Sequence, residues 1–558
     1  LGPMTERLPH GSFLPPDLPA PDRSVERAVL WLGAAVGVLV CLSFGLDVPI
    51  VWKDNQHYFF MAERAAHGVP PYLSTFDPKN ALALLLSGAA IRLGELVGLG
   101  AVASARLLSV GAFGLSSGLV GLLALRLTRS RLVAALSVLG LLSLTYLGFM
   151  AAVGARPKVF LVLFMSGALV AVERERLGRA ALASVLAFLC WQPAAVLWVG
   201  VLAVAGFRPH LRRRIPSVLL AGALPVLAYE AYFLALGALP AQMEQSVRFP
   251  ARFMSHEFPG VLAQLSSLKW IWSRGYGIWN PLPVVFVLSL GALAASASRR
   301  WRSEVSGVLG HAGWLYFDLM MVLWLAMTFY DHQGPPDLFP LAPFLAVVSA
   351  LGVASLVSGL ARRFGPAVRT AAAVAAVALF VLNAAAGVAR RRAFMDREVP
   401  YRLTDQIELG RQVGRMLAAG ERIYAVGATH LLALNHVSNC TVFGSIFRGV
   451  EEYLVESGGG PVYAPRCDAG PPTTILWSYG RLPGWPAWVE AGYEERTTPS
   501  FRVQGIRVWT LRPSPGGEGE AEVSQDRDTS AAGRSTPQDS RTYLLDSNAI
   551  AGVRSRGR

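Results

Sequence analysis

Long apolar segments recur along most of the chain, and they constrain its fold more than any other feature. A helix of about 20 apolar residues crosses the hydrocarbon core of a bilayer. Only 16% of the residues are charged and the mean hydropathy is +0.41, whereas soluble domains carry about 25% charged residues. We therefore predict a polytopic α-helical membrane protein with about 11 transmembrane helices. The apolar runs are residues 28–46, 104–125, 132–152, 157–172, 180–190, 192–207, 215–237, 281–298, 312–330, 338–360 and 367–388.

Arginine clusters between these runs predict the topology. Cytoplasmic loops of membrane proteins carry an excess of Lys and Arg, so the clusters and the N-terminus are expected in the cytoplasm. This topology also accounts for the net charge of +14, and we expect no nucleic-acid partner. The clusters lie at 126–131, 174–179, 208–214, 299–302 and 362–363. The stretches expected outside are 47–103, 153–156, 238–280 and 331–337, followed by the C-terminal part of the chain.

One basic cluster disagrees with this topology. Arg390, Arg391 and Arg392 would lie on the outer side, against the charge rule. If the number of crossings is off by one, the C-terminal domain faces the cytoplasm instead. The run at 80–100 carries two charged side chains, and we expect it to lie at the outer interface rather than to cross the membrane.

Composition divides the chain into four parts. Residues 1–27 are Pro-rich and polar and are predicted to be a disordered cytoplasmic N-terminus, and 28–388 form the membrane domain. Short β-branched or aromatic runs predict a small extracytoplasmic α/β domain over 389–513, with strands at 421–427, 473–480 and 506–513. Residues 514–558 are predicted to be a disordered tail. In an oxidising compartment, Cys440 and Cys467 could form a disulfide.

A dense polar segment, WKDNQHYFFMAERAAHGVPPYLSTFDPKN at 52–80, follows the first apolar run. Its periodicity predicts a helix along the membrane surface, capped by Asp54 or Asn55 and ended by Gly68 and the two prolines after it. The predicted inner face is Tyr58, Met61, Ala62 and Ala65, and the predicted solvated face is His57, Glu63, Arg64 and His67. A carboxylate at a helix start can be only a cap.

The same segment resembles the GT-C glycosyltransferases. It is most similar to the bacterial relatives of protein mannosyltransferases and of lipid A aminoarabinose transferases, the family 39-like group. The stretches CWQPAAVL at 190–197 and DLFPLAPFLAVV at 337–348 also resemble parts of that family. Two departures are clear: Lys79 lacks the two prolines that usually follow it, and Arg156-Pro-Lys158 stands where many relatives have an acidic residue. The matching positions are Asp54, Tyr58, Ala62, Gly68, Pro71, Tyr72 and Lys79.

The resemblance implies an inverting glycosyltransferase of a bacterial inner membrane. Such an enzyme moves a sugar from a polyprenyl phosphate to a glycan, lipid or protein acceptor at the outer face, and Asp54 would be its general base. The leaving phosphate needs fixed positive charge, for which the outer loops offer Lys79, Arg156, Lys158 and His332. The alternatives are a snorkelling interfacial lysine, basic residues that anchor a helix end, and a solvated loop histidine.

Further residues are expected to bind the sugar or acceptor. They are Tyr58, Tyr72, Arg248, Arg252, His256 and Glu257. In the loop at 249–281 the aromatic residues could instead anchor the chain at the interface. No cofactor is expected, and a divalent metal is possible but not favoured, because the second acidic site is missing and Asp47 with Asp54 makes a weak metal pattern. The alternative functions are a lipid-linked-sugar flippase or transporter and a non-catalytic envelope assembly protein.

Overall fold

The computed structural model divides the chain into two compact units, Leu1–Ala393 and Phe394–Arg558, and each is described by itself. The first unit holds the apolar helices and the second holds a small sheet. The described residues are 22–45, 47–50, 53–254, 260–272, 312–330, 335–445, 449–450, 453, 467, 470–478, 489 and 492–512. The side chains of 53, 267–272 and 335 are not included in this description.

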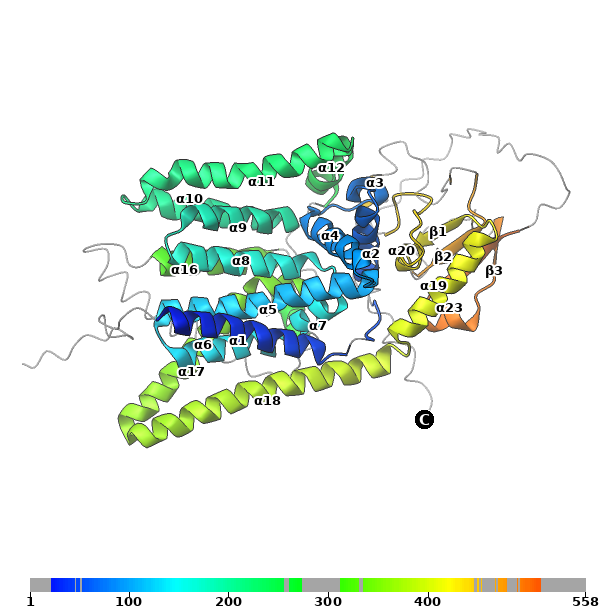
Figure 1. Ribbon diagram of the computed structural model, residues 1–558. Coiled ribbons are helices and arrows are strands. Elements are labelled where there is room, and N and C mark those ends of the chain that lie inside the picture. Colours follow the sequence, from blue (N-terminus) through cyan, green and yellow to red (C-terminus); the bar gives the residue numbers. More distant parts are fainter. Residues whose placement is uncertain are drawn as a thin grey trace, which may run out of the picture. The chain divides into compact units, whose positions relative to one another are not determined.

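Long apolar helices form a bundle in the first unit (Figure 1). Within the described residues, six helical segments are long and apolar enough to cross a membrane, and a seventh is the bent pair α6–α7. The predicted run at 281–298 lies outside the described residues, so the count of 11 stays a prediction. The helices are α1 (Arg23–Leu42), α5 (Ala101–Thr128), α6 (Arg131–Ser143), α7 (Thr145–Val153), α8 (Pro157–Glu173), α9 (Leu177–Cys190), α10 (Ala195–Phe207), α11 (Ile215–Ala235), α16 (Ala312–Tyr330), α17 (Ala342–Phe364) and α18 (Pro366–Glu398).

Two predicted runs are interrupted helices. The run at 132–152 bends by 62° between α6 and α7, and its break lies at Leu144. Between α9 and α10, Trp191 has extended backbone and Pro193 lies in the short helix η1 (Gln192–Ala194). A proline cannot continue the hydrogen-bond ladder of a helix. Each of these two runs is therefore a pair of shorter helices joined at a break.

Small residues let α1 and α5 pack closely. A Cβ atom on Gly118 would lie 2.1 Å from the carbonyl oxygen of Leu30, and one on Gly37 would lie 2.9 Å from the Cα of Gly114. Membrane helices rely on such close packing because lipid tails offer little hydrophobic driving force between them. The contact fixes α1 against α5, the spanning helix that follows the polar segment in the chain.

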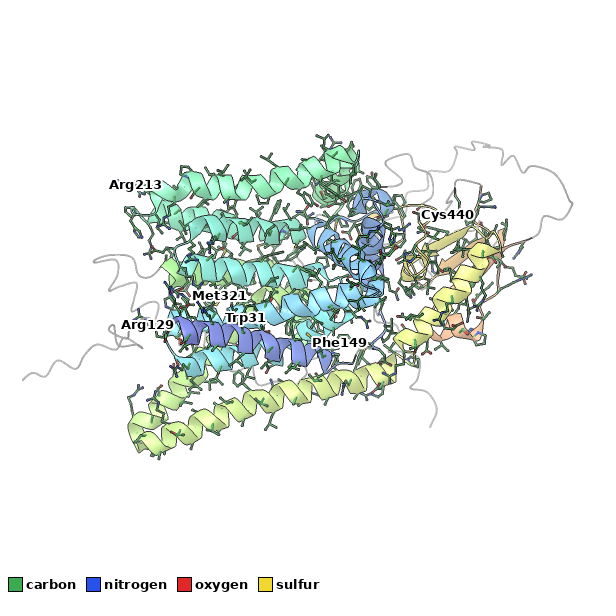
Figure 2. All side chains as sticks on the ribbon, viewed as in Figure 1. Trp31, Arg129, Phe149, Arg213, Met321 and Cys440 are labelled. Atoms are coloured by element: carbon green, nitrogen blue, oxygen red, sulfur yellow. A yellow bond between two sulfur atoms is a disulfide. The ribbon has the colours of Figure 1, made fainter. Side chains whose placement is uncertain are left out.

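The two ends of the bundle differ in charge. Figure 2 shows Arg129 and Arg213, from two of the arginine-rich turns, at one end and Phe149 at the other. At the C-terminal end of α5, Arg126 forms ion pairs with Glu26 of α1 and Glu173 of α8. This arrangement agrees with the predicted alternation of basic and non-basic ends, and it ties three helices together.

Three shorter helices, α2 (Lys53–Ala66), α3 (Pro71–Ser74) and α4 (Leu82–Leu96), lie at the other end of the bundle (Figure 1). The helix α2 runs across the direction of the spanning helices. A Cβ atom on Gly88 of α4 would lie 2.8 Å from the carbonyl oxygen of Ala62, so the two helices are in close contact. The chain continues from α11 through α12 (Leu239–Met243), η3 (Glu244–Arg248), α13 (Phe249–Phe253) and α14 (Val261–Trp272), and η5 (Pro335–Leu341) precedes α17.

The prediction of a solvated face on α2 is wrong for three of its four residues, and only His67 is exposed. His57, Glu63 and Arg64 are all buried, with Glu63 at 0% exposure. Glu63 Oε2 lies 3.0 Å from Arg64 Nε, and Glu63 Oε1 lies 2.8 Å from His67 Nδ1. Charged groups can be buried when they are paired. The two partners of Glu63 therefore offset the free-energy cost of removing its carboxylate from water.

The second unit contains a four-stranded sheet of order β1-β2-β4-β3. The strands β1 (Ile423–Val426) and β2 (Thr474–Trp477) are parallel, and β4 (Arg507–Leu511) is antiparallel to β2 and to β3 (Tyr493–Glu495). Three strands match the predicted ones, and β3 was not expected. The helices α19 (Leu403–Ala418), α20 (His430–Ala433) and α23 (Pro499–Val503) complete the described part of the unit.

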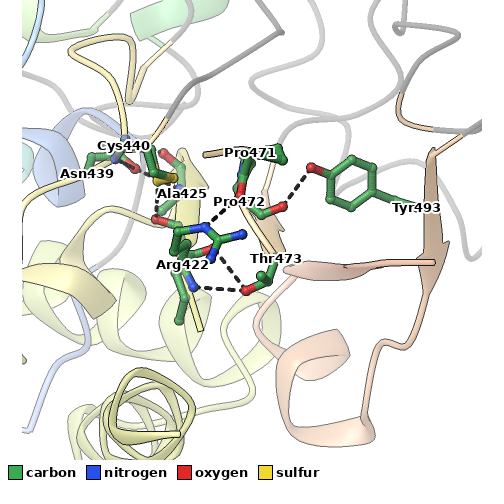
Figure 3. The surroundings of a disulfide bond; sticks show 10 residues. Arg422, Ala425, Asn439, Cys440, Pro471, Pro472, Thr473 and Tyr493 are labelled. Carbon is green, nitrogen blue, oxygen red and sulfur yellow. Dashed lines mark hydrogen bonds between the residues drawn. A yellow bond between two sulfur atoms is a disulfide. The ribbon is translucent and has the colours of Figure 1, made fainter. Parts of the chain in front are cut away.

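Cys440 and Cys467 form a disulfide next to β1 (Figure 3). Arg422, at the start of this strand, donates from Nε to the carbonyl of Pro471 at 2.8 Å. The Tyr493 hydroxyl donates to the carbonyl of Pro472 at 2.7 Å. The disulfide and these bonds together hold the segment before β2 against the sheet.

Candidate active site

Asp54 lies in the first turn of α2, and its side chain is 58% exposed. Arg156, at the N-cap of α8, places Nη2 3.3 Å from Asp54 Oδ2, and its own side chain is only 8% exposed. Arg156 also donates from Nη1 to Asn55 Oδ1 at 2.9 Å. The site therefore combines an accessible carboxylate with a guanidinium that is held in place by two neighbouring residues of α2.

A tight turn places Arg156 at this position. Gly154 and Ala155, between α7 and α8, have φ values of 94° and 52°. Ser109 of α5 accepts a hydrogen bond from the Ala155 backbone N–H at 3.1 Å. The left-handed conformation is unfavourable for alanine, and the bond to Ser109 helps to hold it. The turn directs the start of α8 towards α2.

Tyr58 lies one turn after Asp54 and contacts two cations. Lys79 Nζ is 5.5 Å from the ring centroid, and the guanidinium carbon of Arg156 is 5.4 Å from it. The ring is 4% exposed. A cation within about 6 Å of an aromatic face is attracted to it. The structure therefore places Tyr58 as a support for Lys79 and Arg156.

The loop that carries Lys79 is held from several sides. Asp77 accepts from the Lys79 backbone N–H at 2.7 Å, and its other oxygen lies 3.3 Å from His57 Nε2. Gln245 of η3 accepts from the Asp77 backbone N–H at 3.0 Å. The buried Tyr72 hydroxyl donates to the Lys79 carbonyl at 2.8 Å. Tyr72 thus fixes the backbone of the loop.

Neighbouring charges shift the pKa values of this loop. Partial loss of solvent around Asp54 raises its pKa, but the opposite effect of Arg156 and then Lys79 prevails, so that the pKa lies below its ordinary value of 3.8. Burial likewise opposes the charged form of Lys79, yet Tyr58 and the nearby carboxylates raise its pKa above the ordinary value. At neutral pH the site therefore holds an ionised carboxylate and a charged ammonium group.

Lys158, in the first turn of α8, forms an ion pair with Asp337 of η5. Its Nζ also lies 4.2 Å from the ring centroid of Trp191, which stacks on Trp324 at 5.8 Å. Sequence reasoning missed Asp337 as a site residue, although the stretch that begins with it was recognised as family-like. The Lys158 ammonium is thus oriented by a carboxylate and an aromatic ring.

The remaining predicted residues lie apart from this group or outside the described residues. Arg248 and Arg252 are exposed on η3 and α13, and Arg248 pairs with Glu244 on its own segment at 3.4 Å. His256, Glu257 and His332 lie outside the described residues. The structure therefore brings together Asp54, Tyr58, Lys79, Arg156 and Lys158, with Tyr72 beneath the Lys79 loop.

The apolar helices and this polar end are those of a polytopic helical membrane protein. No protein-family model and no curated protein matches the sequence. Among solved structures, the chain is similar to ArnT from Cupriavidus metallidurans bound to undecaprenyl phosphate, with 15% identity, a TM-score of 0.53, and coverage of 88% of this chain and 99% of that one. The apo state of the same ArnT gives 14% identity, a TM-score of 0.53, and 88% and 98% coverage.

A third solved structure is less similar. The Archaeoglobus fulgidus oligosaccharyltransferase, in complex with Zn and sulfate, has 15% identity and a TM-score of 0.33, with 64% of this chain and 53% of that chain covered. The likeness to ArnT extends over nearly the whole of both chains. The expectation of a GT-C fold is therefore confirmed.

Proposed function

We propose that the protein is a membrane glycosyltransferase that takes a sugar from a polyprenyl-phosphate-linked donor. One observation carries this proposal: the exposed Asp54 carboxylate lies beside Arg156 and within electrostatic reach of Lys79. It does so in a fold shared with an ArnT structure that binds undecaprenyl phosphate. A carboxylate with adjacent fixed cations suits a reaction that removes a proton from one group and releases an anion from another.

Asp54 acts as the general base in this proposal. A hydroxyl of the acceptor attacks the anomeric carbon of the donor sugar, and Asp54 takes the hydroxyl proton as the new C–O bond forms. The bond between that carbon and the phosphate oxygen breaks, and the polyprenyl phosphate leaves with the bonding electrons. Attack on the face opposite the leaving group inverts the anomeric configuration.

Lys79, Arg156 and Lys158 stabilise the phosphate as it leaves. Lys79 and Arg156 lie against Tyr58, and Lys158 lies against Trp191. Fixed cations cost little reorganisation when negative charge develops, and for this reason they lower the barrier. Arg156 and Lys158 also pair with carboxylates, so that the phosphate competes with these internal partners.

The surroundings of Asp54 favour a reaction that is independent of metal ions. Divalent cations are held by several oxygen ligands. Here the charges that act on Asp54 come from Arg156, Lys79, His57 and Lys158. These side-chain charges would repel a divalent metal ion at the Asp54 carboxylate.

The site is proposed to face the outside of a bacterial inner membrane. Arg129 and Arg213 mark the end of the bundle opposite Phe149 (Figure 2), and basic ends face the cytoplasm. The disulfide between Cys440 and Cys467 suits an oxidising compartment for the second unit.

A transfer assay with the intact protein tests the proposal. The protein is incubated with a polyprenyl-phosphate sugar and a panel of glycan, lipid and protein acceptors. The test variant is Asp54→Asn. The control is Asp47→Asn, which changes an exposed carboxylate before α2. A general base contributes about 10²–10⁴-fold, so Asp54→Asn should lose that factor and Asp47→Asn should keep activity. Full transfer by Asp54→Asn would remove Asp54 as the base. Translocation of the lipid without transfer would favour a flippase.

A further inference from the structure

The basic cluster at 390–392 disagrees with the charge rule, and its three arginines have different surroundings. Arg391 is half-buried on the side of α18 that faces the bundle, whereas Arg390 and Arg392 are exposed. The guanidinium of Arg391 lies 4.7 Å from the ring centroid of Tyr146 and 5.6 Å from that of Phe149. Arg391 therefore lies over the aromatic rings of α7.

The packing of α18 explains this orientation. The Ser143 hydroxyl bonds to the Phe380 carbonyl at 3.4 Å. A Cβ atom on Gly387 would lie 2.4 Å from Cγ2 of Thr145. Residues four apart share a helix face, so Arg391 continues the stripe of Gly387 that packs on the start of α7. Figure 2 shows Phe149, one of its two aromatic partners, at the end of the bundle away from Arg129.

Tyr146 connects Arg391 to the candidate active site. The phenol lies within electrostatic reach of Arg156, Arg391, Asp54 and Asp337. Its ring also lies 5.8 Å from that of Phe339 in η5, the segment that carries Asp337. The two guanidiniums of Arg156 and Arg391 thus act on one buried side chain from different helices.

We propose that Arg391 is a further donor-binding residue, whose charge attracts the phosphate of the polyprenyl-phosphate donor to the site beside Tyr146. This proposal rests on the proposed function. Arg156 and Lys158 already face carboxylates of the protein, so a further guanidinium increases the attraction for an anion. It also gives the cluster at 390–392 a role other than a topology signal.

Binding of undecaprenyl phosphate to the full-length protein tests this role, with undecaprenol as the ligand that lacks the phosphate. The variants are Arg391→Gln, which removes the charge and keeps a long polar side chain, and Arg391→Lys, which keeps the charge. Arg390→Gln is the matched control one residue away, at an exposed position. A charged hydrogen-bond partner contributes enough to expect about a tenfold loss of phosphate-lipid affinity in Arg391→Gln.

The expected result is a loss in Arg391→Gln for undecaprenyl phosphate alone, with affinities within about twofold of the parent in Arg391→Lys and Arg390→Gln. An unchanged affinity in Arg391→Gln would overturn the inference while the parent still binds the lipid phosphate. An equal loss for both lipids would assign Arg391 to packing, which also overturns it. If the parent prefers neither lipid, the proposed function fails first, and that failure is visible before any variant is compared.

Discussion

Arg156 Nη2 lies 3.3 Å from Asp54 Oδ2 and joins the start of α8 to the start of α2. The pair links residues about a hundred positions apart, and its two members differ in exposure. Arg156 is buried, but Asp54 remains accessible at 58%. The cation is thus fixed while the carboxylate can still meet a substrate, which is the arrangement that a general base beside a leaving anion requires.

The pH dependence of transfer should reflect the charges around Asp54. A base must be ionised, so activity falls as the pH falls through its pKa. Because the pKa of Asp54 lies below 3.8, the acid limb of kcat/KM should also lie below that value. Removing a cation in Lys79→Met raises the pKa, and the acid limb should move to higher pH.

The measurement is the pH profile of kcat/KM at low and high salt. Asp54 is more than half exposed, so salt should reduce the difference between parent and Lys79→Met. Arg92→Met, which removes an exposed positive charge on α4, is the control and should keep the parental profile. An acid limb that stays in place in Lys79→Met would contradict the electrostatic role of Lys79.

The ion pair of Lys158 and Asp337 should stabilise the bundle only as a pair. Both side chains are largely buried, with exposures of 11% and 16%. Removal of one partner leaves an uncompensated charge, which costs about 3–5 kcal/mol. We expect Lys158→Met to lower the free energy of unfolding by about this amount.

A double-mutant cycle measured by unfolding in detergent checks this expectation. The double variant Lys158→Met/Asp337→Leu should be more stable than the sum of the single losses predicts. The exposed pair of Arg248 and Glu244 is the matched comparison, and Arg248→Met should change stability by less than about 1 kcal/mol. Strictly additive losses at Lys158 and Asp337 would show that the pair has no coupling.

The sequence predicted those parts of the site that lie within one segment or at a helix start. Asp54 and Lys79 belong to one polar segment, and the basic residues at the start of α8 follow an apolar run, so pattern and resemblance together were sufficient. Asp337 and Arg391 could not be assigned in this way. Their positions depend on how η5 and α18 pack against α7 and α8, and no local pattern encodes that packing.

The buried charges of α2 show a second limit. An amphipathic pattern predicts which face of a helix is polar, but it does not predict whether that face is solvated. Glu63 is fully buried because Arg64 and His67 pair with it, and these partners could be recognised only after the fold was known.

The contact between α1 and α5 should be sensitive to a single methyl group. A Cβ atom on Gly118 would lie 2.1 Å from the Leu30 carbonyl oxygen, so Gly118→Ala must move the two helices apart. Overpacking costs about 1–3 kcal/mol. A Cβ atom on Gly111 of the same helix would meet no atom of the described residues within 4 Å, and Gly111→Ala should therefore be neutral or slightly stabilising. Equal thermal unfolding of the two variants would contradict this contact.

The disulfide should stabilise the second unit mainly through the loop that it closes. Cys440 and Cys467 are 27 residues apart in sequence, and closing a loop of this length restricts the unfolded chain by about 3.5 kcal/mol. Cys440→Ser should therefore lower the stability of the second unit in the full-length protein, as measured by proteolysis over a denaturant series. A reductant should have the same effect on the parent and no further effect on Cys440→Ser.

The buried Cys41 of the first unit offers a control, since Cys41→Ala should keep the parental response to the reductant. The location of the bond adds a second readout. If the second unit faces the oxidising side, protein isolated from intact cells under thiol-blocking conditions should already carry the bond. Free thiols at both positions in such protein would contradict the proposed topology, because a cytoplasmic domain would keep Cys440 and Cys467 reduced.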